Sequence, residues 1–133
     1  MTGMKDGDKL SIYADSEIVA KNVTVCVSKA SRRDGLLGKS GISLDEGILM
    51  VMPTGRGNSG WLSAIHMFFM RFAIAVIWID QSHKVVHVAN ARPWGIYYPP
   101  VPAKYVLEVH PDLLKRFVVG DLLAWEKMPV VKS

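Results

Sequence analysis

Two polar residues interrupt the most apolar part of the chain and are the first candidates for chemistry. His66 and Arg71 lie within the stretch 64–79, whose other side chains are all hydrophobic. A guanidinium in such surroundings is costly unless it is paired. Arg71 therefore either forms a structural ion pair with a carboxylate such as Glu108 or Asp80, or binds the carboxylate or phosphate of a ligand. His66 is either a hydrogen-bonded histidine of the core or its rim, or a general base.

A second candidate is the segment 90–103, which carries four of the seven prolines and three aromatic residues. Long connections in compact domains are often functional. Its aromatic rings, together with the ring of an earlier tryptophan, offer flat amphipathic surfaces for a sugar, a nucleobase or a proline-rich peptide. Alternatively, the rings only pin the loop to the core. The ligand site predicted from both candidates comprises His66, Arg71, Arg92, Trp94, Tyr98 and Trp61.

The other residues that could take part in chemistry are better explained by structural roles. His83 and His87 share one face of a straight strand at a separation of about 13 Å, too far for one metal ion. We therefore predict no metal site, and nothing in the chain indicates a cofactor. The segment 55–60 is rich in glycine but lacks the Lys-Ser/Thr ending of a phosphate-binding loop. Cys26 is the only cysteine and reads as a small strand residue.

Length and composition indicate one domain with a real core. The chain has 133 residues, of which 50% are hydrophobic and 21% charged. The apolar stretch 64–79 is shorter than the ~20 residues that a membrane-spanning helix needs, and the first residues lack the apolar region of a secretion signal. We expect a cytoplasmic protein without membrane contact, with a disordered lead-in over 1–9, one β-rich domain over 10–127 and a tail over 128–133.

The net charge of +4 is concentrated in the middle of the chain. Residues 51–104 hold five basic residues and one acidic residue, and the basic and acidic residues elsewhere cancel. This excess is compatible with a pocket for an anionic group. It is too dilute for a nucleic-acid surface, so nucleic acid is not an expected partner.

The hydrophobic pattern predicts about seven short strands and two short helices. Residues 74–79 are apolar on both faces, which is typical of a central strand covered on each side. The first helix is expected after an N-cap at Ser28 or Ser31, with Leu36 and Leu37 on its apolar side and Gly38 after its end. The sum is an α+β domain with a strongly bent sheet or a small barrel. Eight segments are candidates for these strands, namely 10–13, 18–27, 48–52, 61–69, 73–79, 84–89, 105–109 and 122–125, and the second helix is expected over 112–117.

Four motifs in order resemble a known family. They are Arg-Asp-Gly-Leu-Leu-Gly at 33–38, Asp-Glu-Gly-Ile-Leu at 45–49, Ile-His-Met-Phe-Phe-Met-Arg-Phe at 65–72 and Ala-Lys-Tyr-Val-Leu-Glu-Val at 103–109. Together they resemble the domain-of-unknown-function 192 family, also called uncharacterised protein family 0127. The resemblance runs from about residue 23 to 125. It implies a small β-rich α+β fold in a bacterial or archaeal protein, and no established activity, cofactor or substrate.

The chain departs from that family at one position of interest. The family usually continues its Met-Arg-Phe segment with proline, an aliphatic residue and aspartate, and here those positions are Ala73, Ile74 and Ala75. A methyl group cannot coordinate a cation, accept a proton or pair with arginine. The departure therefore argues against an activity that depends on a carboxylate at position 75.

These observations leave three functional hypotheses. The leading one is a non-enzymatic domain that binds a small ligand with an anionic or sugar-like group. The second is a small hydrolase or transferase with His66 as general base, which lacks an evident partner group. The third is a protein-interaction module that uses a sheet edge or the exposed aromatic residues.

Overall fold

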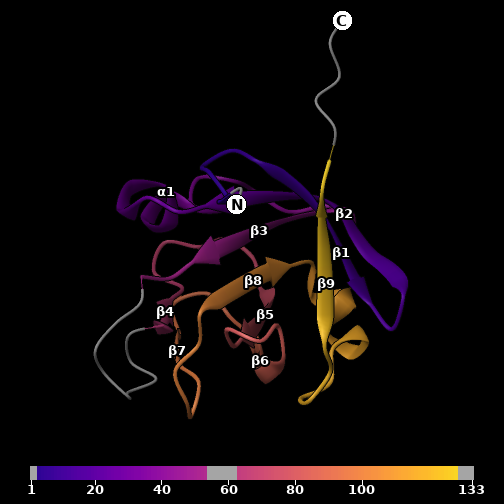
Figure 1. Cartoon of the computed structure of the whole chain (residues 1–133). Helices are drawn as coiled ribbons and strands as arrows, with labels where there is room; N and C mark the ends of the chain where they lie inside the picture. Colours follow the sequence, from indigo (N-terminus) through magenta and orange to yellow (C-terminus); the bar gives the residue numbers. More distant parts are fainter. Residues whose placement is uncertain (1–2, 54–62, 129–133) are drawn as a thin grey trace, which may run out of the picture.

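The described part of the chain forms a β-rich domain that includes the α-helix α1 and the 3-10 helix η2 (Figure 1). The computed structural model describes residues 3–53 and 63–128. Its elements in chain order are β1 (Lys9–Ala14), β2 (Glu17–Cys26), α1 (Lys29–Asp34), β3 (Glu46–Val51), β4 (Ile65–His66), β5 (Ile74–Ile79), β6 (Val85–Ala91), β7 (Ile96–Tyr97), β8 (Tyr105–Val109), η2 (Pro111–Arg116) and β9 (Leu123–Lys127).

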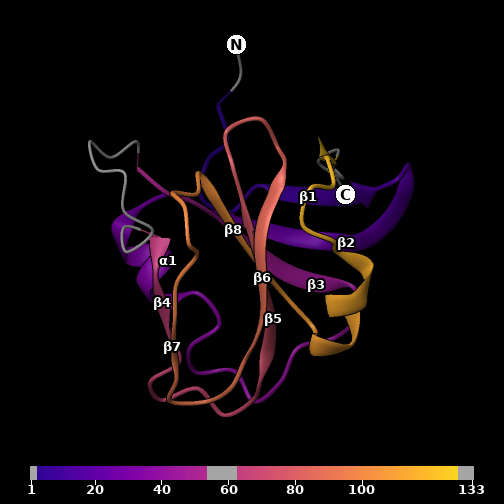
Figure 2. The same ribbon diagram turned by 90° about the horizontal axis from the view of Figure 1, so that it is seen from below.

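Seven of the strands form one curled sheet in the order β6-β5-β8-β3-β2-β1-β9. All neighbouring pairs are antiparallel except β2 and β3. The sheet curls until its two edges meet at one end, where Lys84 and Leu122 form an isolated bridge and the N–H of Gly120 donates to Val85 O at 2.8 Å. Figure 2 shows this curl from below, with η2 beside β5 and β6. The predicted α+β fold with a strongly bent sheet is confirmed.

Each face of the sheet carries its own hydrophobic cluster, because successive side chains of a strand point to opposite sides. The inner cluster fills the curl and includes Ile12, Ile77 and Leu107. The outer cluster includes Trp78 and Val106 and is covered by the segments around α1 and β4. Strand β5 lies between β6 and β8 and is buried at every residue, which confirms the predicted central strand.

The region around β4 differs from the sequence-based expectation. A strand over 61–69 was expected from its apolar composition, but within the described residues only Ile65–His66 are extended. They pair with β7 in a separate two-stranded sheet. The chain then turns away from the main sheet. The N–H of Trp94 donates to Met67 O and the N–H of Met67 donates to Gly95 O, both at 2.7 Å. These bonds tie the turn to the proline-rich connection instead of to the main sheet.

The first helix begins where expected and ends earlier. Ser28 is the N-cap, and its hydroxyl accepts from the N–H of Ser31 at 3.1 Å. Gly35, and not Gly38, ends the helix, with a φ of +39° that favours glycine. A Cβ at Gly35 would lie 3.1 Å from Ile48 Cδ1, so glycine also lets this turn lie close to β3. Residues 36–37, expected on the helix, lie in the turn beyond it.

The N-terminal residues hold the start of this helix. Asp6, within the segment expected as a lead-in, accepts from the N–H of Ser28 at 3.0 Å and from Ser31 Oγ at 2.7 Å. These hydrogen bonds lower the pKa of Asp6 below its ordinary range, so the carboxylate stays charged at the helix N-terminus.

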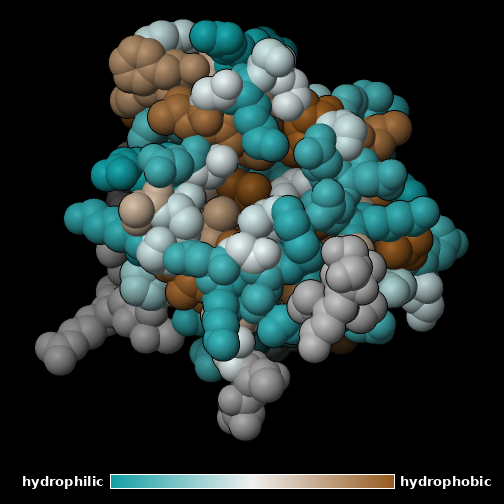
Figure 3. Space-filling model, turned by 90° about the horizontal axis from the view of Figure 1, so that it is seen from above, coloured by the Kyte–Doolittle hydropathy of each residue, from teal (hydrophilic) through white to brown (hydrophobic). Residues whose placement is uncertain are grey.

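The surface above the first two strands is mainly hydrophilic, with small apolar areas between the charged side chains (Figure 3). Across residues 3–53 and 63–128, no helix has both the length and the apolar character needed to cross a membrane.

Candidate functional site

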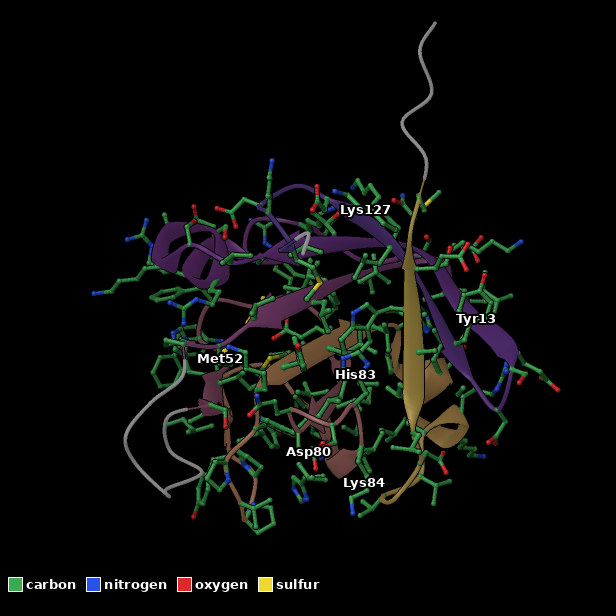
Figure 4. All side chains as sticks on the ribbon, viewed as in Figure 1. Tyr13, Met52, Asp80, His83, Lys84 and Lys127 are labelled. Carbon is green, nitrogen blue, oxygen red and sulfur yellow. The ribbon has the colours of Figure 1, made fainter. Side chains whose placement is uncertain are left out.

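A pocket of about 250 Å³ lies over the outer face of the sheet. One wall comes from α1 and the turn that follows it, and the opposite wall comes from β4 and the turn after β4. Residues of β3, β5 and β8 close its base. In Figure 4, Met52 marks this region between the end of β3 and β4. The pocket therefore uses parts of the chain that are far apart in sequence.

The pocket walls are mostly apolar and rich in methionine. Met50, Met52 and Met67 are buried there, and Met70 is half-buried. Methionine has three rotatable bonds and a polarizable thioether, so it adapts to ligands of different shape. The walls can therefore contact an apolar ligand body without fixing one outline.

Glu108 is the one charged residue at the pocket base among those described. It is 5% exposed, on β8, beside Ile48 of β3 and Val76 of β5. Its carboxyl group has no hydrogen bond or ion pair within the described parts of the chain. Burial raises the pKa of Glu108 from an ordinary 4.5 to about 7. A carboxyl group that titrates near neutrality thus faces an apolar pocket.

Cys26 is affected by the same carboxyl group. Burial, and then the negative charge of Glu108, raise the pKa of the Cys26 thiol. A reactive cysteine needs the opposite environment, in which nearby positive charge favours the thiolate. This environment supports the interpretation of Cys26 as a strand residue, and Cys26 is the last residue of β2.

Positive side chains of α1 lie on one side of the pocket mouth. Lys29 and Arg33 are exposed, and Arg32 is half-buried. The Nε–H of Arg32 donates to Val27 O at 3.2 Å, which holds its side chain against the protein. Arg33 forms an exposed ion pair with Asp34 at 3.3 Å. The mouth can therefore attract an anionic group from solvent.

His66 faces the same mouth from the other side. Its side chain is exposed and lines the pocket. The N–H of Phe68 points at His66 Nδ1 at 3.4 Å. A ring nitrogen that accepts this N–H carries no proton, which leaves Nε2 as the hydrogen-bond donor of the ring. His66 is thus better suited to donate to a ligand than to accept a proton at that atom.

The rings of Phe68 and Phe69 connect His66 with Trp94 in a row of aromatic contacts. The ring of His66 lies 4.8 Å from that of Phe68, Phe68 lies 6.0 Å from Trp94, and Phe69 lies 4.8 Å from Trp94. Phe69 is 70% exposed and Trp94 59%. Both have positive φ, 65° and 71°, which is uncommon for bulky residues. The structure therefore brings the predicted residues His66 and Trp94 onto one surface.

Arg71 lies elsewhere and does not form the expected structural ion pair. It is exposed in the turn before β5, and within the described residues it has no ion pair with Glu108 or Asp80. Asp80 instead accepts from the backbone N–H groups of Ser82 and Lys84, at 2.9 and 3.0 Å. The ion-pair interpretation was wrong because the chain leaves the sheet at this turn. Arg71 is not among the residues that line the pocket.

The remaining predicted site residues lie on or beyond the proline-rich connection. Arg92 and Tyr98 are exposed and do not line the pocket. The backbone N–H of Arg92 donates to the hydroxyl of Tyr97 at 2.9 Å, which pins this connection locally. Trp61 lies outside the described residues.

The two histidines of the hairpin are packing residues. His83 stacks on Trp125 at 3.8 Å between ring centroids, and His87 lies 5.3 Å from Trp78. Figure 4 shows His83 beside β9. In the described ranges, no group of three or more histidine, cysteine, aspartate or glutamate side chains is arranged to hold a metal ion.

Sequence reasoning named Glu108 only as a possible partner of Arg71, and it did not name the methionines or the cations of α1. A signal for Glu108 was present, because it is the one charge in the apolar strand Tyr105–Val109. Because side chains alternate along a strand, Glu108 must face the side of the sheet opposite to Leu107 and Val109, and this alternation is visible in the sequence. The assembly of α1 against β4 had no such signal, since it depends on tertiary contacts.

Solved structures share this fold. A protein of unknown function from Novosphingobium aromaticivorans matches with a TM-score of 0.73 and 18% identity, over 88% of this chain and 84% of that protein. A Sinorhizobium meliloti protein, provisionally described as a transcription regulator, also matches with a TM-score of 0.73, at 20% identity, over 92% of this chain and 98% of its own. At these identities the likeness concerns the fold alone.

Sequence comparisons identify the family. Residues 5–125 match the model of DUF192, described as an uncharacterized ACR. A UPF0127 protein of Thermococcus kodakarensis is 36% identical over 100 residues, which cover 68% of this chain and 61% of that protein. One from Thermococcus gammatolerans is 44% identical over 66 residues, covering 48% and 43%. The chain thus spans less than two thirds of these relatives. It belongs to the DUF192 family, also called UPF0127.

Proposed function

We propose that this protein is a non-enzymatic domain that binds a small ligand with an anionic group in the pocket between α1 and β4. The observation that carries the proposal is the pocket itself, with Lys29, Arg32 and Arg33 at its mouth and apolar walls below them. An anion at the mouth would meet the cations of one helix, of which Arg33 is also paired with the exposed Asp34, while the rest of the ligand is removed from water.

The dimensions and chemistry of the pocket support a small ligand. Its volume of about 250 Å³ lies just below the usual range of ligand sites, about 300 to 1,000 Å³. Such sites combine apolar walls with a few polar groups that fix orientation. Here the polar groups at hand are the α1 cations, the Nε2–H of His66 and the carboxyl group of Glu108.

The same geometry gives less support to a hydrolase or transferase with His66 as general base. The Nδ1 atom of His66 accepts from the N–H of Phe68 and is thereby occupied. Within the described residues, His66 has no ion pair with a carboxylate that would orient it and raise its basicity.

Titration of isotope-labelled protein tests the proposal. The panel contains carboxylates of four to eight carbons, sugar monophosphates and short glycans, and amide resonances report binding. We expect an anionic compound to shift the resonances of Arg32, His66 and Met67, while those of Tyr13 at the far end of the sheet stay unchanged. Arg33→Gln should weaken this binding, and Lys21→Gln, an exposed cation of β2, is the matched control. The proposal is wrong if no compound of the panel shifts the pocket resonances.

A further inference from the structure

The pocket has opposite electrical character at its two ends. Glu108 lies at its base, and Lys29, Arg32 and Arg33 lie at its mouth. Burial alone accounts for the raised pKa of Glu108, and no neighbouring cation lowers it. The α1 cations therefore do not neutralise the carboxyl group, and the two ends act as separate poles with methionine side chains between them.

A carboxyl group in this position lacks the partner that buried polar groups normally have. Unpaired burial of a charged group is costly, and the cost is removed when a complementary group pairs with it. Because Glu108 is 5% exposed and lines the pocket, a molecule inside the pocket can supply that partner. The strongest partner for a carboxylate is a cationic N–H donor, which forms a charge-assisted hydrogen bond.

We propose that the ligand is a small zwitterion with an apolar body, which enters the pocket with its protonated amine first. The amine pairs with the carboxylate of Glu108, the body contacts Met50 and Met67, and the anionic group meets the cations of α1 at the mouth. This inference rests on the proposed function, because it names the ligand class of the same site. Its chemical class is that of an amino acid whose amine and acid are separated by an apolar segment.

Binding of an amine in this pocket should depend on pH. Among the described residues, the titratable and charged groups around Glu108 and along the pocket are Cys26 from β2, His66 from β4, and Lys29, Arg32, Arg33 and Asp34 from α1. Every anionic ligand meets the same groups at the mouth, so a change there affects an amine-bearing anion and a plain anion equally. A bound amine requires ionised Glu108, so the amine should gain affinity relative to a plain anion between pH 5 and 8.

Three probes of matched length test the inference by calorimetry at pH 8. They are 6-aminohexanoate, which is zwitterionic, hexanoate, which has only the anion, and hexylamine, which has only the cation. We expect 6-aminohexanoate to bind about ten- to a hundredfold more tightly than hexanoate, the value of a charge-assisted hydrogen bond. In Glu108→Gln this preference should fall to about twofold or less. Glu108→Asp, which keeps the charge, should retain part of it.

Glu17→Gln is the matched control, because Glu17 is an exposed glutamate at the start of β2, the end remote from α1. It should leave the ranking of the probes unchanged. If hexanoate binds the unmodified protein as tightly as 6-aminohexanoate, the inference fails while the proposed function stands. If Glu108→Gln keeps the preference and remains folded by its amide spectrum, the inference also fails. If none of the three probes binds, the inference fails and the wider anion panel still decides the proposed function.

Discussion

Glu108 and Ala75 lie on neighbouring strands but face opposite sides of the sheet. Ala75 pairs with Val109 and belongs to the inner cluster, whereas Glu108 pairs with Val76 and lines the pocket on the outer side. Position 75, where the resemblance to the family implies an aspartate, is therefore fully buried inside the curl. The absence of a carboxylate at position 75 leaves the carboxyl group of the pocket in place.

The buried carboxyl group should make stability depend on pH in a defined window. The pKa of Glu108 rises from 4.5 to about 7 on folding, so the folded state keeps its proton longer than the unfolded state does. The stabilisation that comes from this tighter proton binding is fully present below about pH 4.5 and is lost as the pH rises through about 7. The unfolding free energy of Glu108→Gln minus that of the unmodified protein should therefore be about 2 to 3 kcal/mol larger at pH 8 than at pH 5.

Urea denaturation at pH 5 and pH 8 measures this difference. Glu17→Gln serves as control, since its exposed carboxylate should change the pH dependence little. An equal stability difference between the unmodified protein and Glu108→Gln at the two pH values would contradict the assignment of Glu108 as a buried, unpaired carboxyl group.

Gly47 should be required for the pairing of β3 with β8. A Cβ atom at this position would lie 2.7 Å from the carbonyl oxygen of Glu108 and 2.8 Å from Val109 Cγ1. Backbone cannot give way as a flexible side chain can, so Gly47→Ala should destabilise the fold by about 2 kcal/mol or more. Gly41→Ala is the control, because a Cβ there meets nothing within 4 Å. Similar thermal midpoints for the two variants would show that this pairing tolerates a side chain.

The start of α1 should depend on the hydroxyl of Ser28. This oxygen accepts from the N–H of Ser31 at 3.1 Å, and loss of such a cap costs about 1 kcal/mol. Ser28→Ala should therefore lower the unfolding free energy by about that amount and weaken binding of any anion held by Arg32 and Arg33. Ser40→Ala, in the exposed turn before β3, should be nearly neutral. A stability loss in Ser28→Ala no larger than in the control would contradict the assigned cap.

Some parts of the fold follow from local pattern and others do not. The central strand β5 was predictable because six successive hydrophobic residues leave neither face for solvent. The β1–β2 hairpin was also predictable, and Asp15 and Ser16 adopt the positive φ values of a tight turn. The end of α1 was missed because the sequence offers glycine at both 35 and 38, and the close approach of residue 35 to Ile48, which favours glycine there, is a tertiary feature.

The site was less predictable than the fold. His66 was found because a polar residue in an apolar stretch is conspicuous, but the same argument overvalued Arg71, which is exposed where the chain turns. Phe69 was overlooked as one more hydrophobic residue, although it is 70% exposed beside Trp94. The local sequence pattern does not show where the tertiary fold places a side chain. For the same reason it could not show that the cations of α1 lie opposite β4.

The most direct test of this account is the pKa of the Glu108 carboxyl group, measured by carbon-13 NMR from pH 4 to pH 9. We predict a value of about 7 in the free protein, because the group is buried without a partner. With saturating 6-aminohexanoate the value should fall, since a bound amine favours the carboxylate. A pKa near 4.5 in the free protein would show that the group is solvated or already paired, and would contradict the pocket described here.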